Sequence, residues 1–178
     1  MKTRDLVIIS LFSILTAIGA YINIPIFYVP FTLQIIFVIM SGIVLGAKRA
    51  ALSQILYLLM GLIGIPVFAG GTAGIQVILK PSFGYIVGFI LGAYTTGRII
   101  EKVKRQNIVA YIIAGLLGLA VVYLLGVTYL YLILNIYFKK GVTMFWAIKN
   151  GILIFLPFDV IKCFIAAFVG LKINKIRN

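Results

Sequence analysis

The chain has 178 residues, of which 63% are hydrophobic and 11% are charged, whereas soluble domains are about 45–50% apolar and about 25% charged. It contains no histidine and one cysteine, which argues against a zinc cluster, a disulfide framework and a Ser-His or Cys-His dyad. The formal net charge is +13, but the sequence offers no long soluble surface for a nucleic-acid groove. We therefore expect an integral membrane protein that is neither an enzyme nor a metal protein.

Six apolar stretches can be expected to cross a hydrocarbon core of about 30 Å as helices. Residues 1–178 are therefore predicted to form a single all-α membrane domain. The second and third stretches are short and are separated by Lys48 and Arg49, which predicts a tight helical hairpin. The approximate limits of the six spans are 6–22, 31–46, 50–65, 83–100, 108–137 and 151–171.

The basic residues predict how these spans are oriented. Ten lie in the segments on the side of both termini, and four lie in the segments on the opposite side. The positive-inside rule then places the N- and C-termini in the cytoplasm. The first 22 residues also have features of a signal peptide, but their removal would leave five spans and spoil this charge pattern.

The first predicted helix carries a stripe of small residues. Ser13 and Ala17 stand at small-xxx-small spacing, which permits close approach of another helix. Such a stripe serves either packing within the protein or docking of a partner, and the pattern alone favours packing.

Two predicted segments bring polar groups to the outer face. Pro30, Thr32 and Gln34 stand where the first outer loop enters the second span, so Thr32 and Gln34 place uncharged hydrogen-bonding groups in the first turn of that helix. Tyr85, early in the fourth span, lies at a similar depth and is either a ligand contact or an interfacial tyrosine.

The segment 66–82, between the third and fourth spans, is expected to be an external glycine-rich loop. Gly70, Gly71 and Gly74 let its backbone turn and approach a ligand closely, while Phe68 and Ile75, among others, are too apolar for a solvated loop. We expect a cap over an external cavity, with a re-entrant loop that binds no ligand as the alternative. The loop lacks the Lys-Ser/Thr ending of a nucleotide-binding P-loop.

The last span holds two charged residues. Asp159 and Lys162 stand three positions apart, which places them on one helix face where each can neutralise the other. A charged side chain costs about 2.5–3.5 kcal/mol at the centre of a membrane helix. Either the pair is a structural lock, or, together with backbone groups freed by Pro157, it forms a site for a small polar ligand.

Four segments are informative together: Val-Pro-Phe-Thr-Leu-Gln at 29–34, Gly-Ile-Pro-Val-Phe-Ala-Gly-Gly at 64–71, Lys-Pro-Ser-Phe-Gly-Tyr at 80–85 and Leu-Pro-Phe-Asp-Val-Ile-Lys at 156–162. In this order and spacing they resemble the BioY family, the biotin-specific substrate-binding (S) components of energy-coupling factor (ECF) transporters. The resemblance implies six helices, a biotin pocket open to the outside of a prokaryotic plasma membrane, and no cofactor. It also implies two kinds of partner, a transmembrane coupling component and a pair of cytoplasmic ATPases.

The resemblance also assigns roles to individual residues. It implies that Ser13 and Ala17 dock on the transmembrane partner. The residues expected to bind biotin are Asp159, Lys162, Tyr85, Gly70, Gly71, Thr72 and Gln34. Three positions depart from the family pattern: Ser13 replaces a usual alanine, and Lys80 and Phe158 replace usual glycines.

Biotin also fits these residues chemically. Its ureido ring presents two N–H donors and a carbonyl, which suit the carboxylate of Asp159 and the ammonium of Lys162, and its apolar parts suit aromatic walls. The alternative gives Lys162 or Lys80 to the biotin carboxylate. Two other functions stay open: an S component for another vitamin, and a membrane scaffold that transports nothing.

Overall fold

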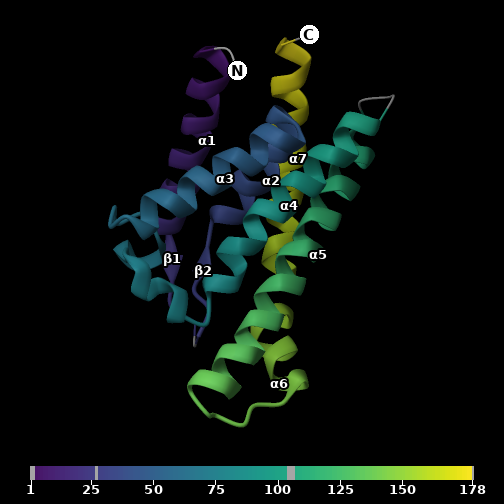
Figure 1. The fold of residues 1–178 in the computed structure, drawn as a ribbon. Coiled ribbons are helices and arrows are strands. Elements are labelled where there is room, and N and C mark those ends of the chain that lie inside the picture. Colours follow the sequence, from purple (N-terminus) through teal and green to yellow (C-terminus); the bar gives the residue numbers. More distant parts are fainter. Residues whose placement is uncertain (1–2, 27, 104–106, 178) are drawn as a thin grey trace.

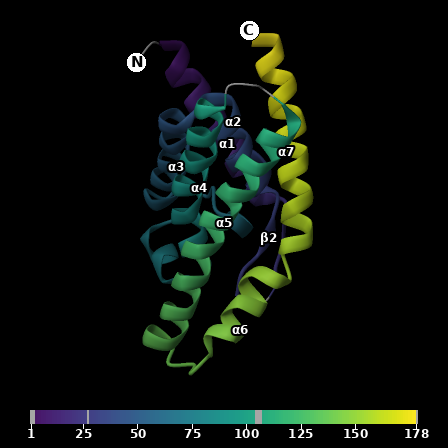
Figure 2. The ribbon, with the colours of Figure 1, turned by 90° about the vertical axis from the view of Figure 1, so that its right-hand side faces the viewer.

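The computed structural model describes residues 3–26, 28–103 and 107–177, and this part of the chain is almost entirely helical (Figure 1). The first helix begins and the last helix ends at the same end of the molecule (Figures 1 and 2). The elements in chain order are α1 (Thr3–Tyr21), β1 (Asn23–Ile24), β2 (Phe31–Thr32), α2 (Gln34–Leu45), α3 (Ala47–Leu62), the 3₁₀ turns η1 (Ala69–Gly71) and η2 (Ile75–Leu79), α4 (Phe83–Lys102), α5 (Ile108–Leu132), the π-helical turn η3 (Ile133–Tyr137), α6 (Met144–Ile148), the π-helical turn η4 (Lys149–Leu153) and α7 (Leu156–Arg177).

Helix α1 has an apolar outer face and a buried inner face on which small and hydroxyl-bearing residues stand beside Ile9 and Phe12. Large side chains such as Leu11, Ile14 and Ile18 are exposed, whereas Ser13 and Thr16 are fully buried. The Thr16 hydroxyl donates to the carbonyl of Phe12, one turn earlier, so its polarity is satisfied within the helix. A helix with its large apolar side chains outward suits a lipid environment.

A single residue joins α2 to α3. Gly46 has φ +78°, a conformation that favours glycine, and its N–H donates to the carbonyl of Gly42 at 3.2 Å. Lys48 and Arg49 belong to the first turn of α3, so the prediction that they form the connection is wrong. The glycine makes the turn, and the two basic residues can therefore be helical.

A short two-stranded sheet precedes α2 and corrects the predicted start of the second span. Residues Asn23 and Ile24 pair antiparallel with Thr32 and Phe31, respectively. The predicted helix start at residue 31 is wrong, because the backbone of residues 31 and 32 is extended and paired, and α2 begins only at Gln34.

Helices α4 and α5 pack with their backbones close together. Three glycines of α4, spaced four residues apart, face α5. A Cβ added at Gly88 would stand 2.9 Å from the carbonyl oxygen of Val122, and one at Gly92 would stand 2.8 Å from that of Gly118. The third, Gly84, would meet the Tyr129 side chain. This spacing is the small-residue pattern of closely packed membrane helices.

The last span is broken. Residues Met144–Leu153 and Leu156–Asn174 form two apolar helical segments bent by 43°, so the prediction of one helix over 151–171 is wrong. Pro157 lies in the first turn of α7. A proline is tolerated in the first turn of a helix because an N–H at that position would have no acceptor within the helix, so Pro157 fits the start of a new helix after the break.

Among the described residues, three helical segments are long and apolar enough to cross a membrane, and the bent pair raises the number to four. The three are Thr3–Tyr21, Phe83–Lys102 and Ile108–Tyr137. Helix α2 is apolar but has only 12 residues, or about 18 Å at about 1.5 Å per residue.

Candidate ligand-binding site

A cavity of about 330 Å³ is lined by residues at the starts of α4 and α7, among others. These two helix starts lie away from the end of the molecule at which α1 begins and α7 ends (Figure 1). Its wall comes from the segment before and into α2, the loop between α3 and α4, and helices α4, α5 and α7. Most lining side chains are aromatic or aliphatic, and a few are polar. The volume and this composition are typical of small-molecule sites, for which about 300–1,000 Å³ is usual.

Asp159 and Lys162 meet on the α7 side of this cavity. Lys162 Nζ donates to Asp159 Oδ1 at 2.6 Å, and both side chains are more than nine-tenths buried. Because α7 begins at residue 156, the two residues lie in its first two turns, and their spacing of three places them one above the other on the same helix face. The structure therefore brings the two predicted residues together as a desolvated ion pair.

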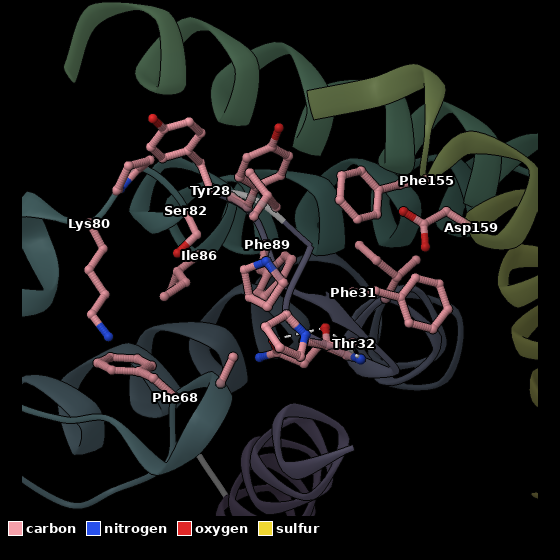
Figure 3. Close-up of a pocket in the computed structure, with 18 of the residues that line it drawn as sticks. Tyr28, Phe31, Thr32, Phe68, Lys80, Ser82, Ile86, Phe89, Phe155 and Asp159 are labelled. Atoms are coloured by element: carbon pink, nitrogen blue, oxygen red, sulfur yellow. Dashed lines mark hydrogen bonds between the residues drawn. The ribbon is translucent and has the colours of Figure 1, made fainter. Parts of the chain in front are cut away.

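The ammonium of Lys162 is held by a second element. Nζ also donates to the carbonyl oxygen of Thr32 at 2.7 Å and lies 3.7 Å from the centre of the Phe31 ring. Figure 3 shows Phe31, Thr32 and Asp159 around the same part of the cavity. The Thr32 carbonyl is free to accept from Lys162 because the backbone of β2 is extended, whereas inside a helix it would accept the backbone N–H four residues later.

Tyr123 of α5 is a site residue that the sequence did not reveal. Its hydroxyl donates to Asp159 Oδ2 at 2.6 Å, so both carboxylate oxygens of Asp159 have a partner. Tyr123 is one of four tyrosines in α5, and no sequence pattern separates it from the other three. A buried tyrosine hydroxyl usually finds an acceptor, but the sequence does not show which one.

Gln34 lines the cavity and belongs to a hydrogen-bonded chain. The Thr32 hydroxyl donates to Gln34 Oε1 at 3.1 Å, and Gln34 Nε2 donates to the Tyr57 hydroxyl at 2.7 Å. Tyr57 in turn donates to the carbonyl of Val67 at 3.3 Å. This chain connects the start of α2 with α3 and with the loop that follows α3, and it orients the Gln34 amide at the cavity wall.

Tyr85 also lines the cavity, but its hydroxyl is engaged elsewhere. It donates to the carbonyl oxygen of Gly151 at 2.9 Å, and the side chain is 7% exposed. The tyrosine therefore offers a ligand the face of its ring, and its hydroxyl ties α4 to the π-helical turn before α7.

The loop between α3 and α4 forms one wall of the cavity. Phe68 and Val77 are almost fully buried and line the cavity together with Thr72. Gly70 and Gly71 do not line it; both have positive φ and shape the turn. Ile75 is 73% exposed, so the apolar side chains of this loop are divided between the cavity and the outside.

Lys80 stands on the other side of the cavity from Asp159 (Figure 3). It is half-buried, and within the described ranges its ammonium makes no ion pair or hydrogen bond. Phe158 is exposed and its ring packs edge-on against Phe31, with 5.4 Å between the centroids. These are two of the three positions that depart from the family pattern, and Lys80 adds a cation to the cavity.

Ser13 and Ala17 are placed away from the cavity and away from the surface. Ser13 is fully buried, Ala17 is 7% exposed, and α1 packs on α2 and α3 of the same chain. The predicted docking role needs a free surface at these side chains, and this structure gives them none. Their burial agrees with the alternative that the stripe serves internal packing.

The apolar helices and the cavity define a multi-pass membrane protein with a small-molecule site. The crystal structure of the S-component for biotin from an ECF-type ABC transporter superposes on the chain with a TM-score of 0.86, at 26% identity, covering 98% of this chain and 95% of that one. A family model described as the BioY family matches residues 1–178. The chain therefore belongs to the BioY family.

Two curated relatives agree with this membership. The chain is 40% identical over 174 residues to the biotin transporter BioY of Thermotoga maritima, covering 98% of each protein. It is 44% identical over 136 residues to the probable biotin transporter BioY of Lysinibacillus sphaericus, covering 76% of this chain and 69% of that protein. The predicted family is confirmed, and membership in a transporter family confirms that the chain is not an enzyme.

Proposed function

We propose that the chain binds biotin and delivers it across the membrane as the substrate-specific component of an ECF-type transporter. One observation carries the proposal: a buried carboxylate and a buried ammonium meet at one side of a cavity whose wall is mostly apolar. Such a cavity suits a ligand with a polar head and an apolar body. The relatives named as biotin transporters and the matching S-component structure support biotin as that ligand.

The ureido ring of biotin fits the pair because both groups keep hydrogen-bonding capacity. A carboxylate has about four acceptor positions, and the protein fills two on Asp159. An ammonium has three donors, and Lys162 uses two, on Asp159 and on the Thr32 carbonyl. Asp159 accepts from the ureido N–H groups and Lys162 donates its remaining N–H to the ureido carbonyl.

The carboxylate of biotin is assigned to Lys80 rather than to Lys162. Lys80 lies across the cavity from Asp159 (Figure 3), and in the part of the chain that the structure describes it has no competing acceptor. A ligand with its ring at Asp159 would extend its chain past Phe68 and Phe89, which line the cavity. Gln34, Tyr85 and Thr72 are the remaining proposed contacts, and Gly70 and Gly71 act through the shape of the loop.

The six-span topology with both termini in the cytoplasm is also part of this proposal. The ten-to-four division of basic residues supports it, as does the common end at which α1 begins and α7 ends. The short helices α2 and α3 then count as spans. The cavity opens toward the outside, and residues 1–178 form one domain.

Transport requires partners in this proposal. Release of a tightly held ligand against a gradient needs energy, and the chain contains no Gly-x-x-x-x-Gly-Lys-Ser/Thr sequence. A transmembrane coupling component and a pair of cytoplasmic ATPases supply it. The match to an S-component from an ECF-type ABC transporter supports this assignment.

Binding of purified protein to biotin, measured by isothermal titration calorimetry in detergent beside riboflavin and thiamine, tests the proposal. Saturable binding of biotin, with neither of the other vitamins competing, is the expected result. Preference for another vitamin would favour the alternative S component. Binding of none of the three by protein that retains a cooperative melting transition would favour a scaffold.

A further inference from the structure

A second cavity, of about 350 Å³, lies at the end of the molecule where α1 begins and α7 ends. It is formed by the end of α2, the first turn of α3 and the C-terminal part of α4 from Tyr94 onward. The wall is rich in charged groups, unlike that of the first cavity. The lining residues are Leu45, Ala47, Lys48, Arg49, Tyr94, Arg98 and Glu101.

The protein itself already occupies the single carboxylate of this cavity. Glu101 Oε1 accepts the backbone N–H of Ala47 at 2.8 Å, and Oε2 pairs with Arg98 at 3.3 Å. Arg49 pairs with Asp5 of α1 at 3.2 Å. Lys48 is exposed, and among the described residues its ammonium makes no ion pair or hydrogen bond. The cavity therefore has a cation available for an anion.

Apolar side chains continue from this cavity along α3 and α4, two of the three helices that form it. On α3, Leu52 lies one turn beyond Lys48 and is 40% exposed. On α4, Tyr94 and Leu91 lie one and two turns before Arg98 and are 40% and 47% exposed. Residues three or four apart share a helix face, so the basic groups stand at one end of an exposed apolar stripe on each helix.

We propose that this cavity binds the phosphate of an anionic phospholipid, with Lys48 and Arg98 as its contacts and an acyl chain along Leu52, Leu91 and Tyr94. A free phosphate would offer the same charge to Lys48, but it would leave the apolar stripes unused. Basic pockets between membrane helices near the bilayer surface have the chemistry that lipid phosphates require. The inference requires only that the start of α3 and the end of α4 lie at one membrane surface. It does not depend on whether the chain binds biotin.

Native mass spectrometry of the purified protein with added phosphatidylglycerol or phosphatidylcholine tests the site. We expect retention of phosphatidylglycerol and no comparable retention of phosphatidylcholine. Lys48→Gln should weaken phosphatidylglycerol binding about fivefold, the factor that corresponds to about 1 kcal/mol per lysine at a membrane surface. Lys140→Gln removes an exposed cation from the opposite end of the molecule and should change nothing.

Inorganic phosphate provides the second arm of the experiment. If phosphate at millimolar concentration displaced phosphatidylglycerol completely, the acyl chain would contribute nothing and a lipid would not be the ligand. Equal retention by Lys48→Gln, Lys140→Gln and the unaltered protein would also overturn the proposal. Cooperative melting of each variant checks its folding, and unchanged biotin affinity of Lys48→Gln is expected because Lys48 does not line the first cavity.

Discussion

Asp159 and Lys162 form a buried ion pair, and removing these two charges from water costs free energy that apolar side chains at the same positions would not cost. Desolvating two charges costs several kcal/mol, and a buried ion pair is often no more stabilising than well-packed apolar side chains. Here each member has a further partner, the Tyr123 hydroxyl for Asp159 and the Thr32 carbonyl for Lys162. These partners hold the pair at the cavity wall, where its unused donors and acceptors can face a ligand.

Replacing either charge should therefore weaken biotin binding strongly. We expect Asp159→Asn and Lys162→Met each to weaken binding about 10- to 100-fold, because each loses a charged hydrogen bond worth about 1.5–3 kcal/mol. Titration calorimetry measures the change. Affinity within about twofold of the unaltered protein in both variants would show that the pair is structural.

The double variant separates the two roles of the pair. A single substitution leaves one buried charge without its partner, which costs about 3–5 kcal/mol. Asp159→Asn combined with Lys162→Met removes both charges, so its melting temperature should recover relative to the worse single variant. Biotin binding should not recover, and recovery of both properties would contradict a direct role in binding.

Lys80 is expected to distinguish biotin from its uncharged esters. Lys80→Gln should weaken biotin binding about fivefold, since a partly exposed ion pair is worth up to about 1 kcal/mol. Binding of biotin methyl ester should change far less, because the ester has no charge to lose. Lys140→Gln serves as the matched control, and equal loss for acid and ester would place the carboxylate elsewhere.

At the scale of elements, the close packing of α4 on α5 positions the site. Tyr85 lies between Gly84 and Gly88 near the start of α4, and Tyr123 follows Val122 on α5. The two tyrosines reach the cavity from neighbouring helices whose backbones are nearly in contact. A shift of one helix relative to the other would therefore move both cavity walls.

Gly88→Ala tests that packing. Its Cβ would stand 2.9 Å from a backbone oxygen and 3.0 Å from the Cα of Val122, and a backbone cannot rotate aside, so we expect a loss of about 1–3 kcal/mol. Gly115→Ala is the matched control, because the nearest atom there is the Cγ2 methyl of Ile39 at 3.0 Å. Thermal unfolding in detergent should rank Gly88→Ala clearly below Gly115→Ala, and the reverse order would refute this account.

The loop after α3 depends on a second close contact. A Cβ at Gly61 would overlap the ring of Phe68, at 2.0 Å from its Cζ, and Phe68 is a buried wall of the cavity. Gly61→Ala should therefore lower both biotin affinity and melting temperature. Adding Phe68→Leu removes the overlapping ring and should restore part of the melting temperature, while biotin affinity stays low. Absence of any thermal recovery would show that Phe68 is not the contact.

For the whole molecule, the distribution of charge predicts how it sits in the membrane. In a Cys163→Ala background, Thr72→Cys should react with an impermeant maleimide added outside intact cells. Asn107→Cys, which also loses the N-terminal cap of α5, should react only after permeabilisation. The reverse pattern would invert the topology, and two reactive outside positions would change the number of spans.

The sequence by itself was sufficient for the class of protein and for the pairing of Asp159 with Lys162. An apolar fraction of 63% indicates a chain surrounded by lipid. A charge inside a membrane helix requires a partner, and the spacing of three residues between Asp159 and Lys162 indicates that each is the partner of the other. Both inferences depend on local properties: hydropathy, charge and helical periodicity. The same is true of the limits predicted for the first, fourth and fifth spans, which agree with α1, α4 and α5–η3 to within a few residues.

Only the tertiary structure decided which residues meet across elements. The hydroxyl of Tyr123, the carbonyl of Thr32 and the ring of Phe31 reach the ion pair from α5 and from β2, and no local pattern encodes those distances. The burial of Ser13 and Ala17 against the chain's own helices likewise depends on where α2 and α3 lie. A small-residue stripe looks the same whether its neighbour belongs to the same chain or to another, because sequence periodicity defines a helix face but not what packs against it.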